Sequence, residues 1–159
     1  MQNCSMLPHD VFSSIVRHAP LVSIDLVIRN PRGEILVGFR RNRPAQGYWF
    51  VPGGRIGKGE RIAEAFARIT RGELGTEHRI ENAVFLGVFE HIYEDNFSGD
   101  PSFGPTMSYS AMPSPQIRLR SHHRRTSITP ISGCRRLTLW RGRTCMSTRS
   151  GTSSKPINY

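Results

Sequence analysis

Residues 49–75, WFVPGGRIGKGERIAEAFARITRGELG, combine residue types that bind a phosphate group with types that bind a divalent metal ion. A pair of glycines forms a turn before a helical segment, and the N-terminus of a helix offers N–H groups and a positive dipole end to an anion. Arg40 and Arg55 add guanidinium groups that neutralise phosphate oxygens. The Glu73 carboxylate, together with a backbone carbonyl, can hold Mg²⁺ against the same phosphates. These residues indicate a diphosphate ligand and a divalent metal ion.

The elements expected to position these residues are short strands on either side of one helix. Apolar, β-branched runs flank the turn sequence RNPRG and predict a hairpin, and GYWFVPGG predicts a short strand that ends in a glycine turn. Apolar residues at helical spacing predict a helix from about residue 60 to 74, with Gly75 as its C-cap. The predicted strands cover residues 21–28, 34–39, 47–54 and 83–93.

The net charge of +10 is distributed unevenly along the chain. Residues 1–104 contain twelve basic and twelve acidic side chains, whereas residues 105–159 contain nine arginines, Lys155 and no acidic residue. Beyond Gly104 neither a helical nor a strand period is sustained. This pattern predicts a folded domain at 1–104 and a basic, disordered tail at 105–159.

Cysteine usage and hydropathy exclude several classes of protein. The three cysteines are an odd number without metal-type spacing, which argues against a disulfide framework and against a zinc site. The chain has no run of about 18 apolar residues and no N-terminal signal region, so neither a membrane span nor secretion is indicated. We expect a cytoplasmic protein.

A set of glycines, glutamates and one arginine matches the Nudix box. The matching residues are Gly54, Glu60, Arg68, Glu73 and Gly75. Ile69 and Gly72 occupy box positions that carry glutamate, and Thr70 and Thr76 replace apolar residues. Loss of box glutamates is typical of the GDP-mannose mannosyl hydrolases, and the sequences NRPAQGYWFVPGGR and DNFSG are similar to that subfamily. The chain therefore resembles a GDP-mannose mannosyl hydrolase over about residues 6–104.

The resemblance implies an α+β Nudix fold, with a mixed β-sheet between helices, and a homodimer. It also implies Mg²⁺-dependent hydrolysis of GDP-mannose or GDP-glucose to GDP and free hexose, by attack of water at C1 of the sugar. Carried over by position, the implied site residues are Gly53 and Glu73 for the metal ion, Arg40 and Arg55 for the diphosphate, Asp25 and His91 at the sugar, and Met6, Leu7 and Phe12 near the nucleotide. The catalytic residues among them are Asp25, Arg40, Arg55 and His91.

Several of these residues also have a structural explanation. Arg68 lies four residues after Glu64 on the predicted helix, which favours an ion pair over a contact with substrate. Taken alone, Glu73 is typical of a solvated glutamate, and His91 fits a core histidine as well as a sugar site. Asp25 lies inside an apolar strand, and this position favours a function because a buried carboxylate needs a partner.

The tail contains traces of a second reading frame. Read from the third base of suitable codons, TMSYSA encodes Asp-His-Val-Val-Phe-Gly, and TSITPISGC encodes Gln-His and, after two further residues, Tyr-Gln-Trp-Leu. RTCMST encodes Asn-Val-His-Val-Asn in the same frame. All three fragments resemble the C-terminal half of the subfamily, which indicates a frameshift near residues 99–105; a genuine basic tail is the alternative. The frameshift would remove the expected glutamine ligand of Mg²⁺ and the expected general-base histidine, which His122 and His123 do not replace.

Two other functions compete with hydrolysis of a GDP-hexose. An ordinary Nudix enzyme would cleave the diphosphate of a nucleotide derivative, but Ile69 and Gly72 remove carboxylates that this chemistry uses. Binding of nucleic acid through the arginine tail would depend steeply on salt. The tail has no recognisable recognition module, so we do not expect a nucleic-acid partner. The expected partners are a GDP-hexose substrate and a second copy of the chain.

Overall fold

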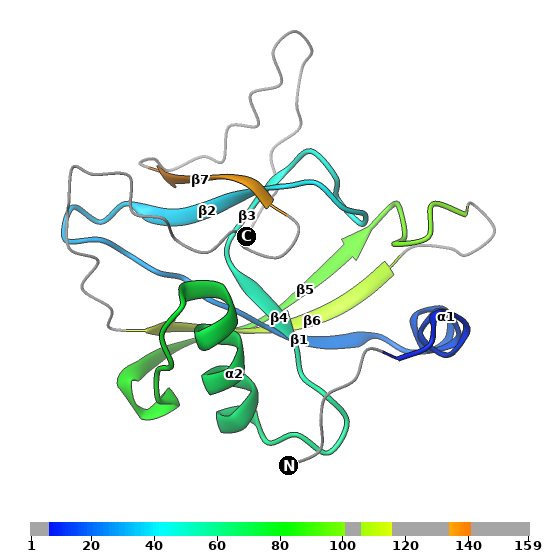
Figure 1. The fold of residues 1–159 in the computed structure, drawn as a ribbon, viewed down its shortest axis with the longest axis horizontal. Helices are drawn as coiled ribbons and strands as arrows, with labels where there is room; N and C mark the ends of the chain where they lie inside the picture. The colour runs from blue at the N-terminus through cyan, green and yellow to red at the C-terminus, as the bar shows by residue number, and fades with distance from the viewer. Residues whose placement is uncertain (1–6, 101–105, 116–133, 141–159) are drawn as a thin grey trace, which may run out of the picture.

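A computed structural model of the chain describes residues 7–100, 106–115 and 134–140 (Figure 1). These residues form a short helix, a series of strands interrupted by a second helix, and a single 3-10 turn. In chain order the elements are α1 (His9–His18), β1 (Leu21–Asp25), β2 (Ile35–Arg40), β3 (Trp49–Phe50), β4 (Gly53–Arg55), α2 (Ile62–Leu74), the 3-10 turn η1 (Ile80–Asn82), β5 (Ala83–Tyr93), β6 (Thr106–Pro115) and β7 (Cys134–Trp140). None of the helices in these ranges is long and apolar enough to cross a membrane.

The described strands form two sheets. The four-stranded sheet has the order β4-β1-β6-β5, in which β1 is antiparallel to β4 and parallel to β6. The pairing of β5 with β6 is antiparallel, so this sheet is mixed. The three-stranded sheet has the order β3-β2-β7 and is antiparallel throughout. The predicted α+β class with a mixed sheet is thereby confirmed.

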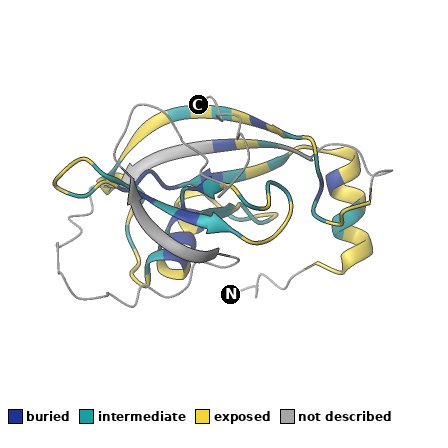
Figure 2. Ribbon diagram, turned by 90° about the horizontal axis from the view of Figure 1, so that it is seen from above, coloured by how far each residue is buried: buried dark blue, intermediate teal, exposed yellow. Residues whose placement is uncertain are grey.

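The core forms where α2 packs against β1 and the segment that follows it. On α2, Ala65, Phe66 and Ile69 lie at helical spacing on one face and are nearly fully buried. They pack with the apolar residues Ile24, Leu26, Ile28 and Leu36. Figure 2 shows buried positions gathered where α2 meets the strands, whereas α1 is exposed over most of its length. The helix is therefore attached to the sheet by apolar burial along one face.

Most element predictions are confirmed, with two refinements. The helix ends where expected, because Gly75 adopts a left-handed conformation with φ 73° and donates its N–H to the Arg71 carbonyl. The predicted strand at 47–54 is divided into β3 and β4 around Pro52, which has no N–H to donate. The predicted hairpin is reduced to its closing turn, where Arg29 bridges Ile35, because β1 itself pairs with β4 and β6.

The prediction that residues 105–159 lack regular structure is wrong for two segments. Residues 106–115 form β6, which lies between β1 and β5, and residues 134–140 form β7 beside β2. A central strand is held by backbone hydrogen bonds to both neighbours, so it does not require a sustained apolar period. Ser110, which is 1% exposed, illustrates this, because its hydroxyl lies 2.6 Å from the Ser23 hydroxyl. The remainder of the predicted tail, 116–133 and 141–159, lies outside the described residues.

Candidate active site

The two residues expected to bind a metal ion lie on neighbouring elements. Glu73 is in the last turn of α2, is 8% exposed, and its Oε2 has no hydrogen-bond partner among the described residues. Burial raises the pKa of Glu73 from 4.5 to about 7. One turn earlier on α2, the Ile69 side chain packs against Gly54, the residue after Gly53. A buried carboxylate oxygen without a partner fits Mg²⁺, which binds few protein oxygens and keeps water or phosphate ligands.

Gly53 is required by close packing against β1. It pairs with Asp25 in the sheet, and a Cβ atom on Gly53 would lie 2.5 Å from Asp25 Oδ1 and 2.6 Å from the Ile24 carbonyl oxygen. Any larger side chain would therefore displace Asp25 or the strand. Among the described residues, no group of three or more His, Cys, Asp or Glu side chains could hold a metal ion. The expected metal ligands, Glu73 and the Gly53 carbonyl, would therefore act without such a cluster around them.

The departures from the Nudix box on α2 have different structural roles. Ile69 is 3% exposed and belongs to the core, whereas Gly72 is exposed and has no atom within 4 Å of its Cβ position. Thr70 is fully buried; its hydroxyl donates to the Ala67 carbonyl and accepts from the His78 N–H, both at 3.0 Å. Thr70 thus anchors the segment that follows the helix, and Ile69 uses a box-glutamate position for apolar packing.

Arg68 has a structural role, but the predicted partner Glu64 is wrong. Arg68 forms a two-pronged ion pair with Glu60, with Nε 2.6 Å from Oε1 and Nη2 2.8 Å from Oε2. The same Nη2 donates to the Arg55 carbonyl at 2.8 Å. Glu64 instead accepts from the Arg61 N–H at 3.0 Å, because the first turn of a helix has unpaired N–H groups. Arg68 therefore holds the loop before α2 and the backbone of Arg55.

Asp25 and His91 are brought together across β6. Leu21 and His91 are both paired with Ser108, and this register places β1 and β5 side chains on the same face of the sheet. His91 Nε2 lies 3.5 Å from Asp25 Oδ2, and both side chains are largely buried. Burial raises the pKa of Asp25, while a hydrogen bond from Ser110 and the charges of His91 and Arg40 oppose that rise. The predicted sugar-side pair is thus assembled, with Arg40 close enough to act on it electrostatically.

Two aromatic residues that were not predicted border this pair. The Tyr93 ring is parallel to that of His91, with centroids 6.1 Å apart, and lies 6.1 Å from the Phe50 ring. The Arg40 guanidinium lies 5.5 Å from the centroid of Phe50. Burial raises the pKa of Tyr93, so its phenol stays protonated. A sequence signal existed, because Tyr93 is two residues from His91 on a predicted strand and therefore shares its face.

The nucleotide-side residues are only partly assembled. The Arg55 guanidinium lies 4.1 Å from the centroid of the Phe12 ring on α1, within the range of a cation–π contact. Leu7 is half exposed beside α1, and Met6 lies outside the described residues. In the sheet Arg55 is paired with Ser23, two residues from the Asp25–Gly53 pair. β4 thus carries both the expected carbonyl ligand and one expected diphosphate arginine, next to Asp25 on β1.

Comparisons with known proteins agree on the family. A model of the NUDIX domain matches residues 19–127. The low-salt glycan biosynthesis protein Agl8 of Haloferax volcanii is 49% identical over 88 residues, which cover 55% of this chain and 54% of that protein. The chain therefore matches about half the length of this relative.

Solved structures share the fold at low sequence identity. The MutT NUDIX hydrolase from Burkholderia pseudomallei superposes with a TM-score of 0.57 at 22% identity, covering 77% of this chain and 84% of that one. The MutT protein from Methanosarcina mazei Go1 gives a TM-score of 0.51 at 18% identity, covering 76% and 77%. Together with the domain match over most of the chain, these similarities establish that the chain belongs to the Nudix hydrolase family.

Proposed function

We propose that this chain is of the GDP-mannose mannosyl hydrolase type, which converts GDP-mannose or GDP-glucose to GDP and free hexose. The observation that carries the proposal is that acid–base groups lie on the sheet, whereas a box position on α2 that carries glutamate in the Nudix box has lost its carboxylate. On α2, Ile69 is a core residue at a box-glutamate position, whereas Asp25 and His91 lie 3.5 Å apart on the sheet. The box on α2 therefore carries fewer of the carboxylates that activate water for attack on phosphorus. The sheet carries a carboxylate and an imidazole, which suit attack at a sugar carbon.

The leaving group would be GDP, and two arginines would stabilise the charge that grows on it. In the proposed reaction the bond between C1 and the phosphate oxygen breaks, and a water oxygen forms the new bond to C1. Arg40 and Arg55 would bind the diphosphate through charge-assisted hydrogen bonds. Mg²⁺, when held by the Gly53 carbonyl and Glu73, would supply further positive charge at the same oxygens.

Asp25 would act at the sugar carbon. Positive character develops at C1 as the bond to phosphate lengthens, and a nearby carboxylate stabilises an oxocarbenium-like state. Burial raises the pKa of Asp25, and the hydrogen bond from Ser110 and the nearby His91 and Arg40 act in the opposite direction, towards the ionised form that this role requires. His91, on the same face of the sheet, would keep the carboxylate in place.

The similarity to a glycan biosynthesis protein supports a sugar nucleotide as substrate, since such proteins handle activated sugars. The homodimer and the cytoplasmic location remain predictions. We further propose that turnover by this chain is impaired, because the predicted frameshift removes the expected glutamine ligand and general-base histidine. Activity should therefore be measured both for this chain and for a protein in which the reading frame is restored.

The test is incubation of both forms with GDP-mannose and with GDP-glucose in the presence of Mg²⁺, followed by chromatography of the nucleotide products. The proposal expects GDP from the frame-restored protein and little turnover by the printed chain. Release of GMP from either substrate would instead favour ordinary cleavage of the diphosphate, which family membership leaves as the second candidate.

A further inference from the structure

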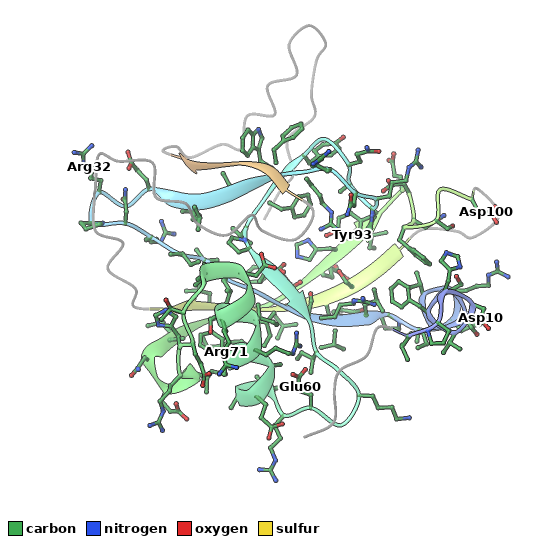
Figure 3. All side chains as sticks on the ribbon, in the orientation of Figure 1. Asp10, Arg32, Glu60, Arg71, Tyr93 and Asp100 are labelled. Atoms are coloured by element: carbon green, nitrogen blue, oxygen red, sulfur yellow. The ribbon has the colours of Figure 1, made fainter. Side chains whose placement is uncertain are left out.

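The segment after β5 lies between the two parts of the chain that carry the diphosphate arginines. In Figure 1 this loop extends beyond the end of β5, with the β2–β3 loop on one side and α1 on the other. Figure 3 shows the same arrangement, with Tyr93 at the end of β5 and Asp100 above the helix that carries Asp10. A hydrogen bond connects the loop to the β2–β3 loop, and an aromatic contact connects it to α1.

On one side, Asp95 anchors the β2–β3 loop. Asp95 Oδ1 accepts the Ala45 N–H at 2.9 Å, although the two residues are fifty positions apart in the chain. Ala45 has a φ of 58°, a conformation that a non-glycine residue adopts at a cost unless its surroundings hold it. The Asp95 bond supplies such a restraint.

The anchored loop ends directly on Arg40. The Arg40 N–H donates to the Tyr48 carbonyl at 2.8 Å, and the Gly47 N–H donates back to the Arg40 carbonyl at 2.9 Å. Within the loop, Arg40 Nε donates to the Asn42 carbonyl at 3.3 Å. The backbone and the guanidinium of Arg40 are thus both bonded to the loop that Asp95 fixes.

On the other side, Phe97 supports the ring that underlies Arg55. Its centroid lies 4.7 Å from that of Phe12 and 5.5 Å from that of His9, both on α1. The opposite contact of Phe12 is with the Arg55 guanidinium, at 4.1 Å. Arg55, Phe12 and Phe97 therefore form a continuous series of contacts that ends on the same short loop as Asp95.

Asn96 fixes the directions in which its two neighbours extend. It is 4% exposed, and its Oδ1 accepts from the N–H groups of Ser98 and Gly99 and from the Ser98 hydroxyl. Its Nδ2 donates to the Asp100 carbonyl at 2.7 Å. A buried amide with these bonds satisfied makes the turn rigid, so Asp95 is held towards Ala45 and Phe97 towards Phe12.

We propose that residues 95–97 form a clip that positions Arg40 and Arg55 for one diphosphate. Asp95 acts through the β2–β3 loop and Phe97 acts through Phe12, so both are positioning residues that need not touch the ligand. The inference rests on the proposed function, because it assigns the two arginines to the diphosphate of a GDP-hexose.

The experiment measures the dissociation constant of GDP for the full chain by calorimetric titration with Mg²⁺ present, which requires no turnover. Asp95→Ala should weaken binding about fivefold to tenfold, as expected for loss of one restraining hydrogen bond. Asp95→Asn keeps an acceptor oxygen and should restore most of the affinity. Glu94→Ala, which removes the neighbouring exposed carboxylate, is the matched control and should leave the affinity unchanged.

Double substitutions separate positioning from a general structural effect. In an Arg40→Gln background Asp95→Ala should cause no further loss, because the group that it positions is already absent. Phe97→Leu should behave in the same way towards Arg55→Gln, and this second arm decides the question if Asp95→Ala fails to fold. Full additivity in both pairs, or unchanged affinity in both single variants, would overturn the clip while leaving the proposed function intact. Absence of GDP binding by both the unsubstituted chain and the frame-restored protein would overturn both.

Discussion

Glu73 shows, at the scale of a single residue, how burial prepares a side chain for an ionic partner. Its carboxylate is 8% exposed, and one oxygen has no hydrogen-bond partner within the described part of the chain. A buried anion without a partner costs free energy, so the group takes up a proton more readily, and its pKa rises to about 7. The same cost is removed when a cation binds.

This cost gives the metal-free protein a predictable dependence on pH. Folding favours the protonated form of Glu73, so its stabilising contribution is complete below the unfolded pKa of 4.5 and is lost as pH rises through about 7. Glu73→Gln is neutral at every pH. The variant and the unsubstituted chain should therefore have the same free energy of unfolding at about pH 4.5. At about pH 8 the free energy of unfolding of the variant should be higher by about 1–3 kcal/mol, measured by urea denaturation without metal.

At about pH 8, added Mg²⁺ should make the unsubstituted chain more stable than Glu73→Gln, because the ion stabilises only the chain that keeps the carboxylate. Glu64→Gln, on the exposed side of the same helix, is the control and should not change the response to Mg²⁺. If Glu73→Gln and Glu64→Gln respond to pH and metal alike, Glu73 is not the ligand.

At the scale of elements, the sequence predicted those with a clear local signal. The periodic apolar residues and Gly75 placed α2 within two residues, and the bounds of β5 were predicted at 83–93. β6 and β7 were missed because a paired strand depends on neighbours that are distant in the sequence. Ser110, for example, is polar and is buried because β6 pairs with β1. For the same reason, the sequence suggested Glu64 as the partner of Arg68, since spacing within a helix cannot reveal the loop that carries Glu60.

A double-mutant cycle on α2 tests this correction. Arg68→Gln should lower the free energy of unfolding by about 1–2 kcal/mol, because it removes a two-pronged, partly exposed ion pair and the bond to the Arg55 carbonyl. The coupling energy measured by urea denaturation should be appreciable for Arg68 with Glu60 and near zero for Arg68 with Glu64. Equal coupling to both glutamates would contradict the assigned pair.

Restoring the two missing box glutamates should have opposite effects on stability. Ile69→Glu would bury a carboxylate in the core and should destabilise the fold by at least about 3 kcal/mol. Gly72→Glu replaces an exposed helical glycine with open space around it, and should stabilise by about 0.5–1 kcal/mol. Thermal melting of the two variants checks the contrast, and comparable melting temperatures would show that position 69 does not face the core.

At the scale of the whole molecule, the sheet leaves a large apolar surface uncovered on β5. Phe85 and Val88 are each 64% exposed and Ile92 is 61% exposed, on a strand of the domain at 1–104 that the predicted frameshift leaves incomplete. Exposed apolar side chains in such number favour aggregation or burial against another chain. That residues beyond about 104 are not the natural continuation of the domain stays a prediction, and the exposed surface of β5 gives it a measurable consequence.

The frameshift interpretation predicts an insertion or deletion in the coding DNA before codon 106. Sequencing of that region should reveal an uninterrupted alternative frame through the segment that encodes Tyr-Gln-Trp-Leu, and stop codons in that frame would refute the interpretation. The frame-restored protein should also remain soluble at concentrations at which the printed chain aggregates, because more of the apolar sheet surface is covered. Light scattering of the two proteins at matched concentration provides this comparison.

The central claim concerns which bond is broken, and hydrolysis in ¹⁸O-labelled water tests it directly. The frame-restored protein, given GDP-mannose and Mg²⁺, should place the label on C1 of the free sugar, with inversion of configuration at that carbon. Mass spectrometry of both products locates the label, and NMR of the first-formed sugar gives its configuration. Unlabelled sugar with ¹⁸O in the phosphate would contradict the account and assign the protein to ordinary diphosphate cleavage.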